Sequence, residues 1–342
     1  MRQWVVGKGS TSFAGLRLVN APEPAPGPGE VKIRVHACSL NYRDQMIPLG
    51  KYMGGPVTQD TVPLSDGVGE VVALGEEVSG FAVGDRVAGC FFQNWIDGPP
   101  NPGAGPALGA PPATGMLQDF VCLPAQGVVP IAQSLSFEQA ACLPCAGVTA
   151  WNALMEGPRP VRAGDSVLVL GTGGVSLLAL QIAKAAGARV IATSSSDDKL
   201  ARVAALGADE TINYRVVPQW GAKAAELAKN QSDSGGVDHV VEVGGAGTLA
   251  QSFTAVGFGG EVALIGALTR EGDTSPHGLM FKGASLRGIF VGSRGMAVRL
   301  NHFIDAHAIR PVIDRTFAIE DAREAWAYQA SESLFGKVVI TV

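Results

Sequence analysis

Residues 166–176 read SVLVLGTGGVS and decide the fold of the second half of the chain. An apolar run that ends in a glycine-rich turn predicts a buried strand, and LLALQIAKAAGA (177–188) predicts the helix that follows. Gly171 and Gly173 let the backbone turn tightly and approach a pyrophosphate at the helix N-terminus, while Ser176 takes the place of the third glycine. This context favours a dinucleotide site over a plain tight turn. The residues expected to hold the cofactor here are Gly171, Thr172, Gly173, Gly174 and Val175.

The alternation of strand and helix continues after this turn. ARVIAT (188–193) reads as the next strand and DDKLARVAALGA (197–208) as the next helix, with Asp197 as its N-cap and Gly207 as its end. Further predicted strands are TINY (211–214), VDHVVEV (237–243), EVALIG (261–266) and LRGIFVG (286–292). Apolar strands that alternate with helices predict an α/β fold with a doubly wound parallel sheet, a Rossmann domain, over residues 126–294.

The first 125 residues have a different sequence pattern. VKIRVHAC (31–38), GVGEVVALG (67–75) and RVAGCFF (86–92) are rich in valine and interrupted by glycine, which is typical of a twisted, partly open β-barrel. The terminal segment 295–342 is expected to return to this region and complete it. A chain of 342 residues is too long for one ordinary core, so two domains are expected.

Composition excludes several classes of function. Apolar residues make up 46% of the chain and charged residues 17%, which fits a packed globule rather than a disordered chain. A net charge of −5 gives no electrostatic reason to expect nucleic acid or an anionic membrane as a partner. Five scattered cysteines argue against a disulfide framework, and the start MRQWVVGKGST lacks the apolar core of a secretory signal; a cytoplasmic protein is expected. A hydrolase is disfavoured because the sequence has no G-x-S-x-G motif.

The end of the second predicted strand bears on the choice of dinucleotide. An NAD site usually places an acid there, whereas this chain has the uncharged run 193–196, TSSS. Hydroxyl groups together with a nearby cation suit the 2′-phosphate of NADP, so NADPH is the expected cofactor. NAD remains the alternative, in which the cations are ordinary surface charges; the following acids, Asp197 and Asp198, are explained by helix capping. The residues expected to read the phosphate are Ser194, Ser195, Lys199 and Tyr214, with Arg215 beside them.

Motifs along most of the chain resemble the medium-chain dehydrogenase/reductase superfamily. They include PGEVKIRVHAC, GVGEVVALG, LPCAGVTAWNAL, GTGGVSLLALQIAKAAGA and FGKVVI. The resemblance implies a GroES-like, mostly β catalytic domain beside the Rossmann domain. It also implies an oxidoreductase that uses a nicotinamide cofactor.

The motifs that hold catalytic zinc in part of that superfamily are altered in this chain. Asn41 stands in place of the first cysteine, Leu64-Ser65-Asp66 in place of Gly-His-Glu, and only Cys145 matches the third ligand. The loop 93–116 replaces the four cysteines of the structural zinc lobe. Catalytic zinc needs three protein ligands, so no metal is expected, and Cys145 is expected to pack beside the cofactor. This favours the zinc-free branch, which resembles the NADPH quinone oxidoreductases.

The resemblance also implies roles for single residues. Asn41 and Tyr52 are expected to donate hydrogen bonds to the substrate oxygen, with ordinary turn residues as the alternative. Thr149 is expected to lie against the nicotinamide, or else to be a core hydroxyl. Around the nicotinamide carboxamide and the pocket rim, the expected residues are Gly266, Ala267, Leu268, Val291, Ser293, Gly336 and Lys337.

Together these observations predict an NADPH-dependent, metal-independent reductase of quinones or α,β-unsaturated carbonyls. Without a Lewis acid, a substrate that delocalises the product anion is easier to reduce than a simple ketone. A zinc-free alcohol dehydrogenase or carbonyl reductase and a non-catalytic dinucleotide-binding protein are the alternatives. A homodimer through the edge strand near Leu286–Val291 is also expected.

Overall fold

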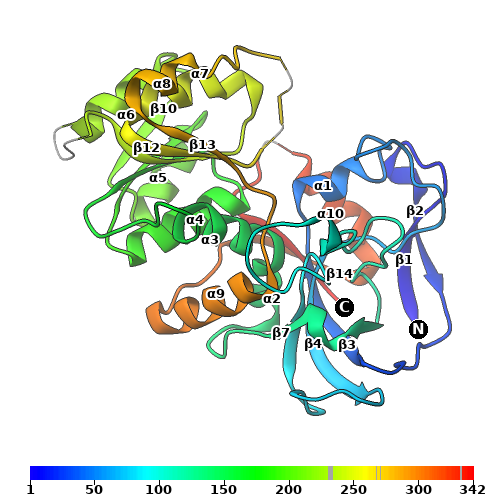
Figure 1. The fold of residues 1–342 in the computed structure, drawn as a ribbon. Helices are drawn as coiled ribbons and strands as arrows, with labels where there is room; N and C mark the ends of the chain where they lie inside the picture. Colours follow the sequence, from blue (N-terminus) through cyan, green and yellow to red (C-terminus); the bar gives the residue numbers. More distant parts are fainter. Residues whose placement is uncertain (230–233, 267, 270, 332) are drawn as a thin grey trace. The chain divides into compact units, whose positions relative to one another are not determined.

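The computed structural model describes Met1–Val342 except for residues 230–233, 267, 270 and 332. The described chain divides into two compact units (Figure 1). Unit 1 comprises Met1–Val148 and Gly292–Val342, and unit 2 comprises Thr149–Val291. Each unit has its own core of buried apolar side chains.

Unit 2 is built on a six-stranded parallel sheet in the order β10-β9-β8-β11-β12-β13. This order is that of a Rossmann fold, in which the strand sequence reverses between β8 and β11. The prediction of a doubly wound sheet is therefore confirmed. The strands are β8 (Ser166–Leu170), β9 (Arg189–Ser194), β10 (Glu210–Asn213), β11 (Val237–Glu242), β12 (Val256–Leu264) and β13 (Ser285–Gly288).

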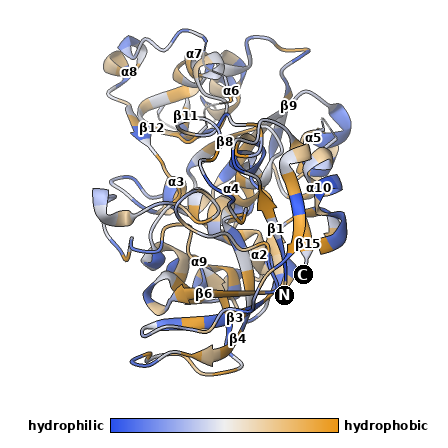
Figure 2. Ribbon diagram, turned by 90° about the vertical axis from the view of Figure 1, so that its right-hand side faces the viewer, coloured by the Kyte–Doolittle hydropathy of each residue, from blue (hydrophilic) through white to orange (hydrophobic). Residues whose placement is uncertain are grey.

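Helices cover both faces of this sheet. Figure 1 shows α4 and α5 on one face and α6, α7 and α8 on the other. Each helix buries one apolar side, as Leu200 and Val203 do on α5, and the mixed colouring of α5 in Figure 2 reflects this. The helices are α3 (Val148–Met155), which begins at the last residue of unit 1, and α4 (Gly174–Ala185), α5 (Asp197–Ala205), α6 (Trp220–Lys229), α7 (Ala246–Ala255) and α8 (His277–Lys282).

Unit 1 is mostly β structure. Its seven-stranded sheet runs β14-β15-β3-β4-β5-β7, with β6 paired to β3, and β1 and β2 form a separate antiparallel pair. The strands are β1 (Arg2–Val6), β2 (Leu16–Asn20), β3 (Glu30–Ser39), β4 (Asp66–Leu74), β5 (Arg86–Gly89), β6 (Phe120–Pro124), β7 (Val128–Pro130), β14 (Ile313–Ala318) and β15 (Lys337–Thr341). Helices α1 (Tyr42–Met46), α2 (Phe137–Ala141), α9 (Arg294–His307) and α10 (Ala322–Gln329) complete it.

The C-terminal strand closes the sheet of unit 1. β15 pairs antiparallel with β3, so residues from the two ends of the chain become neighbours. This places Lys337, the first residue of β15, beside the loop that follows β3. The segment Gly292–Val342 belongs to unit 1 together with Met1–Val148.

Two boundaries differ from those expected. The boundary expected after residue 125 falls inside unit 1, because β7 pairs with β5 and α2 packs against β3 and β4. The strand expected over 286–292 ends at Gly288, and Val291 could not belong to it, because its backbone is left-handed, with a φ of 56°. Within the described residues, each helix is too short or too polar to cross a membrane.

Candidate active site

The glycine turn between β8 and α4 forms an open cradle in unit 2. Gly171 has a φ of 71°, which favours glycine, and its N–H donates to Thr193 O (3.0 Å) on the neighbouring strand. A Cβ on Gly171 or Gly173 would meet no other part of the chain within 4 Å. The start of α4 therefore faces free space, and its unpaired N–H groups fit a pyrophosphate there.

Ser176 explains how the turn tolerates the loss of its third glycine. Its side chain is almost completely buried, and its hydroxyl donates to Leu170 O (2.7 Å) at the end of β8. The helix therefore packs on the strand through a hydrogen bond that glycine could not make.

The end of β9 presents hydroxyl groups rather than an acid. Ser194 is 3% exposed and its Oγ accepts from Ser196 N (3.4 Å), while its carbonyl accepts from Tyr214 N (3.1 Å). Ser196, not Asp197, caps α5, since its Oγ accepts from Lys199 N (3.4 Å). The N-cap prediction was wrong by one residue because serine and aspartate both cap helices well. Ser195 and Lys199 are half-buried, and Tyr214 is 41% exposed.

The turn after β11 is organised by a buried carboxylate. Glu242 Oε1 accepts from the N–H groups of Gly244 (2.7 Å) and Gly245 (3.0 Å) and from Thr248 Oγ1 (2.6 Å). Gly266 packs against this turn so closely that a Cβ would lie 1.6 Å from Val243 O. The backbone at residue 266 is therefore held against the turn after β11, and β11 is one of the two strands between which the strand order reverses.

The other residues expected around the nicotinamide differ from one another in their exposure to solvent. Leu268 is 49% exposed, Thr149 is buried in α3, and Ala267 lies outside the described residues. Gly336 has a φ of 94°, and a Cβ there would lie 2.5 Å from Val312 O, so the entry to β15 itself requires this glycine.

A buried network holds the backbone of Val291 in a conformation that valine disfavours. Its carbonyl accepts a hydrogen bond from Asn152 Nδ2 (2.7 Å). Asn152 Oδ1 accepts from Arg287 Nη1 (3.1 Å), and Arg287 is paired with Glu261 (2.9 Å). A left-handed β-branched residue is strained, and such strain is concentrated at functional sites.

Lys337 organises the candidate substrate-binding residues of unit 1. Its ammonium group donates to Leu40 O (2.6 Å) and Asn41 Oδ1 (2.6 Å) and lies 3.7 Å from Asp66 Oδ2. Because Oδ1 of Asn41 is occupied, the amide is oriented and its Nδ2 becomes the available donor. That Nδ2 is buried and has no hydrogen-bond partner among the residues described.

A second buried ion pair, between Arg43 and Asp44, follows Asn41 in the sequence. Arg43 Nη1 is 3.5 Å from Asp44 Oδ1 and donates to Leu108 O (2.8 Å), while the Tyr52 ring lies 4.9 Å from the guanidinium carbon. Burial raises the pKa of Asp44 to about 6; Arg43 opposes this shift and Asp66 adds to it. Asp44 therefore changes charge close to neutral pH.

This shift predicts a pH dependence of stability. Below pH 4 Asp44 is protonated in the folded and the unfolded state; between pH 4 and 6 only the folded state keeps its proton. Folded-state stability therefore falls as pH rises through this window, by up to about 3 kcal/mol. Urea unfolding of wild type and Asp44→Asn from pH 4 to 7 should show the wild type losing this amount relative to the variant. Parallel curves would show that Asp44 does not titrate there.

Cys145 lies in a π-helical turn, Leu143–Gly147, just before α3. Its N–H donates to Asp66 Oδ2 (3.3 Å), and burial together with Asp66 raises the pKa of its thiol above the ordinary value. In the described part of the chain, no group of three or more His, Cys, Asp or Glu side chains could hold a metal ion. Asp66 instead faces the N–H of Cys145 and the ammonium of Lys337. This donor set does not fit catalytic zinc.

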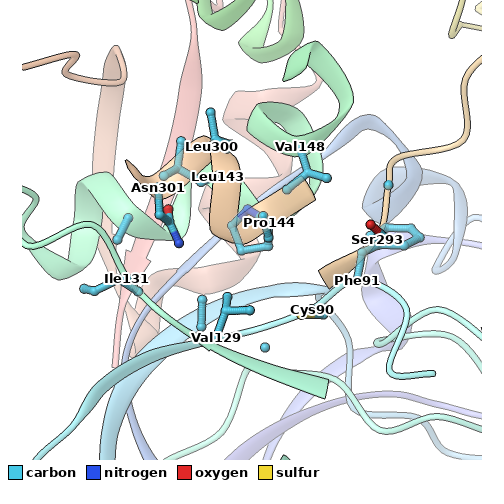
Figure 3. Close-up of a pocket in the computed structure, with 15 residues that line it drawn as sticks. Cys90, Phe91, Val129, Ile131, Leu143, Pro144, Val148, Ser293, Leu300 and Asn301 are labelled. Atoms are coloured by element: carbon cyan, nitrogen blue, oxygen red, sulfur yellow. The ribbon is translucent and has the colours of Figure 1, made fainter. Parts of the chain in front are cut away.

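A small, mostly apolar pocket lies within unit 1 (Figure 3). Phe91 and Ser293 lie on one side of it, and Ile131 and Asn301 on the other. Ser293 caps α9, and its hydroxyl donates to Asp97 Oδ1 (3.2 Å), so its side chain is already engaged.

Phe92 and Trp95 are buried and do not line this pocket. Both belong to an aromatic cluster with Phe91. The loop 93–116 packs part of its length into unit 1, with Leu108 and Met116 almost fully buried.

Sequence reasoning missed several residues that shape the site. Arg43 and Asp44 carried one signal, two opposite charges that follow Asn41 closely in the sequence. Glu242 carried another, an acid at the C-terminal end of the buried strand β11. Nothing in the sequence pointed to the pairing of Asn152 with Arg287.

Comparison with known proteins agrees with the fold of both units. Residues 27–133 match the alcohol dehydrogenase GroES-like domain, and residues 174–306 match the family described as zinc-binding dehydrogenase. A putative alcohol dehydrogenase from Sinorhizobium meliloti 1021 has a similar crystal structure, with a TM-score of 0.89 and 40% identity over 100% of both chains.

Three curated relatives cover most of the chain. A zinc-type alcohol dehydrogenase-like protein of Schizosaccharomyces pombe is 43% identical, over 92% of this chain and 91% of the relative. Quinone oxidoreductase of Rattus norvegicus is 30% identical, over 88% of this chain and 85% of the relative. The 2-methylene-furan-3-one reductase of Solanum lycopersicum is 31% identical, over 91% and 71%.

Proposed function

Because the chain belongs to the medium-chain dehydrogenase/reductase superfamily of NAD(P)H-dependent oxidoreductases, we propose that it reduces quinones or α,β-unsaturated carbonyls with NADPH and without a metal. The observation that carries this proposal is the buried, unpartnered Nδ2 of Asn41, whose amide is oriented by Lys337. A neutral donor held in a dry site suits a product anion whose charge is delocalised. Two relatives, a quinone oxidoreductase and a reductase of an enone, act on this substrate class by name.

NADPH supplies a hydride when bound. The residues of the chain would bind the cofactor and hold the substrate oxygen. The open cradle at Gly171–Val175 would receive the pyrophosphate, and the hydroxyl-rich end of β9, with Ser194, Ser195, Lys199 and Tyr214, would receive the 2′-phosphate. Gly266, Leu268, the left-handed backbone at Val291, and Thr149, all in unit 2, would contact the nicotinamide. Asn41 and Tyr52 would donate to the substrate oxygen. Water is the proton source for the adjacent carbon.

A substrate panel tests the reaction type. Purified protein is mixed with NADPH or NADH and with an enone, a quinone or a saturated ketone, and cofactor oxidation is followed by absorbance. Oxidation of NADPH with the enone or quinone but not with the ketone is expected. Turnover of the ketone alone would point to an alcohol dehydrogenase or carbonyl reductase. Tight NADPH binding without any turnover would point to a non-catalytic binding protein.

Cofactor preference is tested at the end of β9. Ser194→Asp places a negative charge where the 2′-phosphate is expected, and repulsion of a few kcal/mol should weaken NADPH binding by roughly 100-fold. The affinity for NADH should change far less. Ser194→Asn is the matched control because it adds similar bulk without charge. Equal losses for both variants would reject the assignment of this site to the 2′-phosphate; fluorescence titration measures both constants.

The assembly and location are also proposals. β13 is an edge strand with Leu286 40% exposed, and pairing of two such strands would form a homodimer. Light scattering should then give twice the chain mass of 35.2 kDa, and a single-chain mass would contradict it. Five free cysteines fit a reducing compartment such as the cytoplasm.

A further inference from the structure

Arg43 is a buried cation that the reaction described above does not use. Its side chain is 9% exposed and is flanked by the rings of Tyr52 and Phe91, each 4.9 Å from the guanidinium carbon. Nη1 is committed to Leu108 O and to the ion pair with Asp44. One corner of the guanidinium is therefore anchored, and two aromatic rings lie close to its central carbon.

The opposite edge of the guanidinium is free. Nε and Nη2 are buried, and neither has a hydrogen-bond partner among the described residues. The hydroxyl of Tyr52 favours the charged guanidinium but completes no hydrogen bond to either nitrogen. Buried donors are almost always paired in folded proteins, so two orphaned N–H groups on one edge indicate a missing acceptor.

The arrangement of the two free N–H groups indicates which kind of acceptor would bind there. Nε–H and Nη2–H form the parallel fork that binds two oxygens of one carboxylate or phosphate. Burial alone would lower the pKa of Arg43, but Asp44 and Tyr52 more than offset this, so the group keeps its charge. The fork lies next to the proposed substrate donors, because Asn41 precedes α1 and Tyr52 contacts the guanidinium itself.

We infer that Arg43 binds the carboxylate of an acidic substrate, an enone that carries a carboxyl group, through Nε and Nη2. This rests on the proposed function and narrows its substrate class. For 4-oxopent-2-enoate, hydride from NADPH would add to C2, the enolate would form over C3, C4 and the ketone oxygen, and a proton from water would add to C3. The products are NADP⁺ and 4-oxopentanoate, and the carboxylate stays on Arg43 throughout.

The test compares 4-oxopent-2-enoate with its methyl ester, which keeps the enone but removes the charge. Wild type should favour the acid by roughly 100-fold in kcat/KM, and in Arg43→Gln this ratio should fall to near 1. Arg43→Lys keeps the charge and packing but loses the fork, so it should show an intermediate ratio. It also keeps the test valid if the glutamine variant does not fold. A wild-type ratio near 1, or equal losses for acid and ester, would overturn the inference.

Two binding measurements separate the remaining explanations. If the fork instead holds a phosphate of the cofactor, Arg43→Lys will weaken NADPH binding at least tenfold and leave the acid-to-ester ratio intact, which overturns the inference. Calorimetry with 4-oxopentanoate needs no turnover. Binding by wild type that weakens at least tenfold in Arg43→Lys supports the carboxylate site even if neither enone is reduced, in which case the proposed reaction alone has failed. If wild type neither binds 4-oxopentanoate nor reduces either enone, both the carboxylate site on Arg43 and the proposed reaction are contradicted.

Discussion

Replacing Gly173 with alanine is expected to weaken NADPH binding by roughly 10- to 100-fold while the protein stays folded. Gly173 is the N-cap of α4, with φ −82° and ψ 177°, which alanine also adopts, and a Cβ there would meet no other part of the chain within 4 Å. The loss of helix capping costs at most about 1 kcal/mol. The added methyl group would occupy the space that a pyrophosphate needs, and overpacking of this kind typically costs ~1–3 kcal/mol.

Gly278→Ala is the matched control for this prediction. Gly278 lies on α8, and a Cβ there would touch only Phe253, at 4.0 Å. The control should bind NADPH as wild type does, as measured by fluorescence titration, and both variants should have melting temperatures near that of wild type. If Gly173→Ala binds NADPH with wild-type affinity, the turn is not the pyrophosphate site.

Replacing Lys337 with methionine should destabilise unit 1 by roughly 3–5 kcal/mol. Lys337 is 3% exposed, and methionine has a similar length but no charge or donor. The substitution leaves Asp66 buried without its cation and removes the donor to Leu40 O and Asn41 Oδ1. Breaking a buried ion pair by removing one partner is costly because the other charge remains desolvated.

A double-variant cycle separates charge from packing. Asp66→Asn in the Lys337→Met background should restore part of the lost stability, since it removes the uncompensated charge. Urea unfolding gives the four free energies. Lys337→Met should also lower kcat, because the Asn41 amide is no longer oriented. A variant as stable and as active as wild type would show that Lys337 is a passive core residue.

The sequence predicted the parts of the fold that depend on local pattern. Buried strands such as β8 and the glycine turn after it follow from apolar periodicity and from the conformational freedom of glycine. The exact helix start was not predictable, because Ser196 and Asp197 have nearly equal capping preference. Val291 was read as part of a strand because valine rarely adopts a left-handed backbone.

The charged part of the site could not be predicted, because its partners are distant in sequence. Lys337 and Asn41 are separated by 296 residues, and Asn152 and Val291 by 139. A single sequence contains no information on which buried charges meet. The resemblance predicted that Asn41 and Lys337 belong to the site, but only the structure shows that one orients the other.

The central claim is that hydride goes to the conjugated carbon of an unsaturated carbonyl without help from a metal. The most direct measurement uses protein dialysed against a chelator, NADPH deuterated at C4 of the nicotinamide, and pent-3-en-2-one. Nuclear magnetic resonance of the product should show a single deuterium on the carbon β to the carbonyl. Deuterium on the carbinol carbon, or turnover only after zinc is added back, would contradict the account.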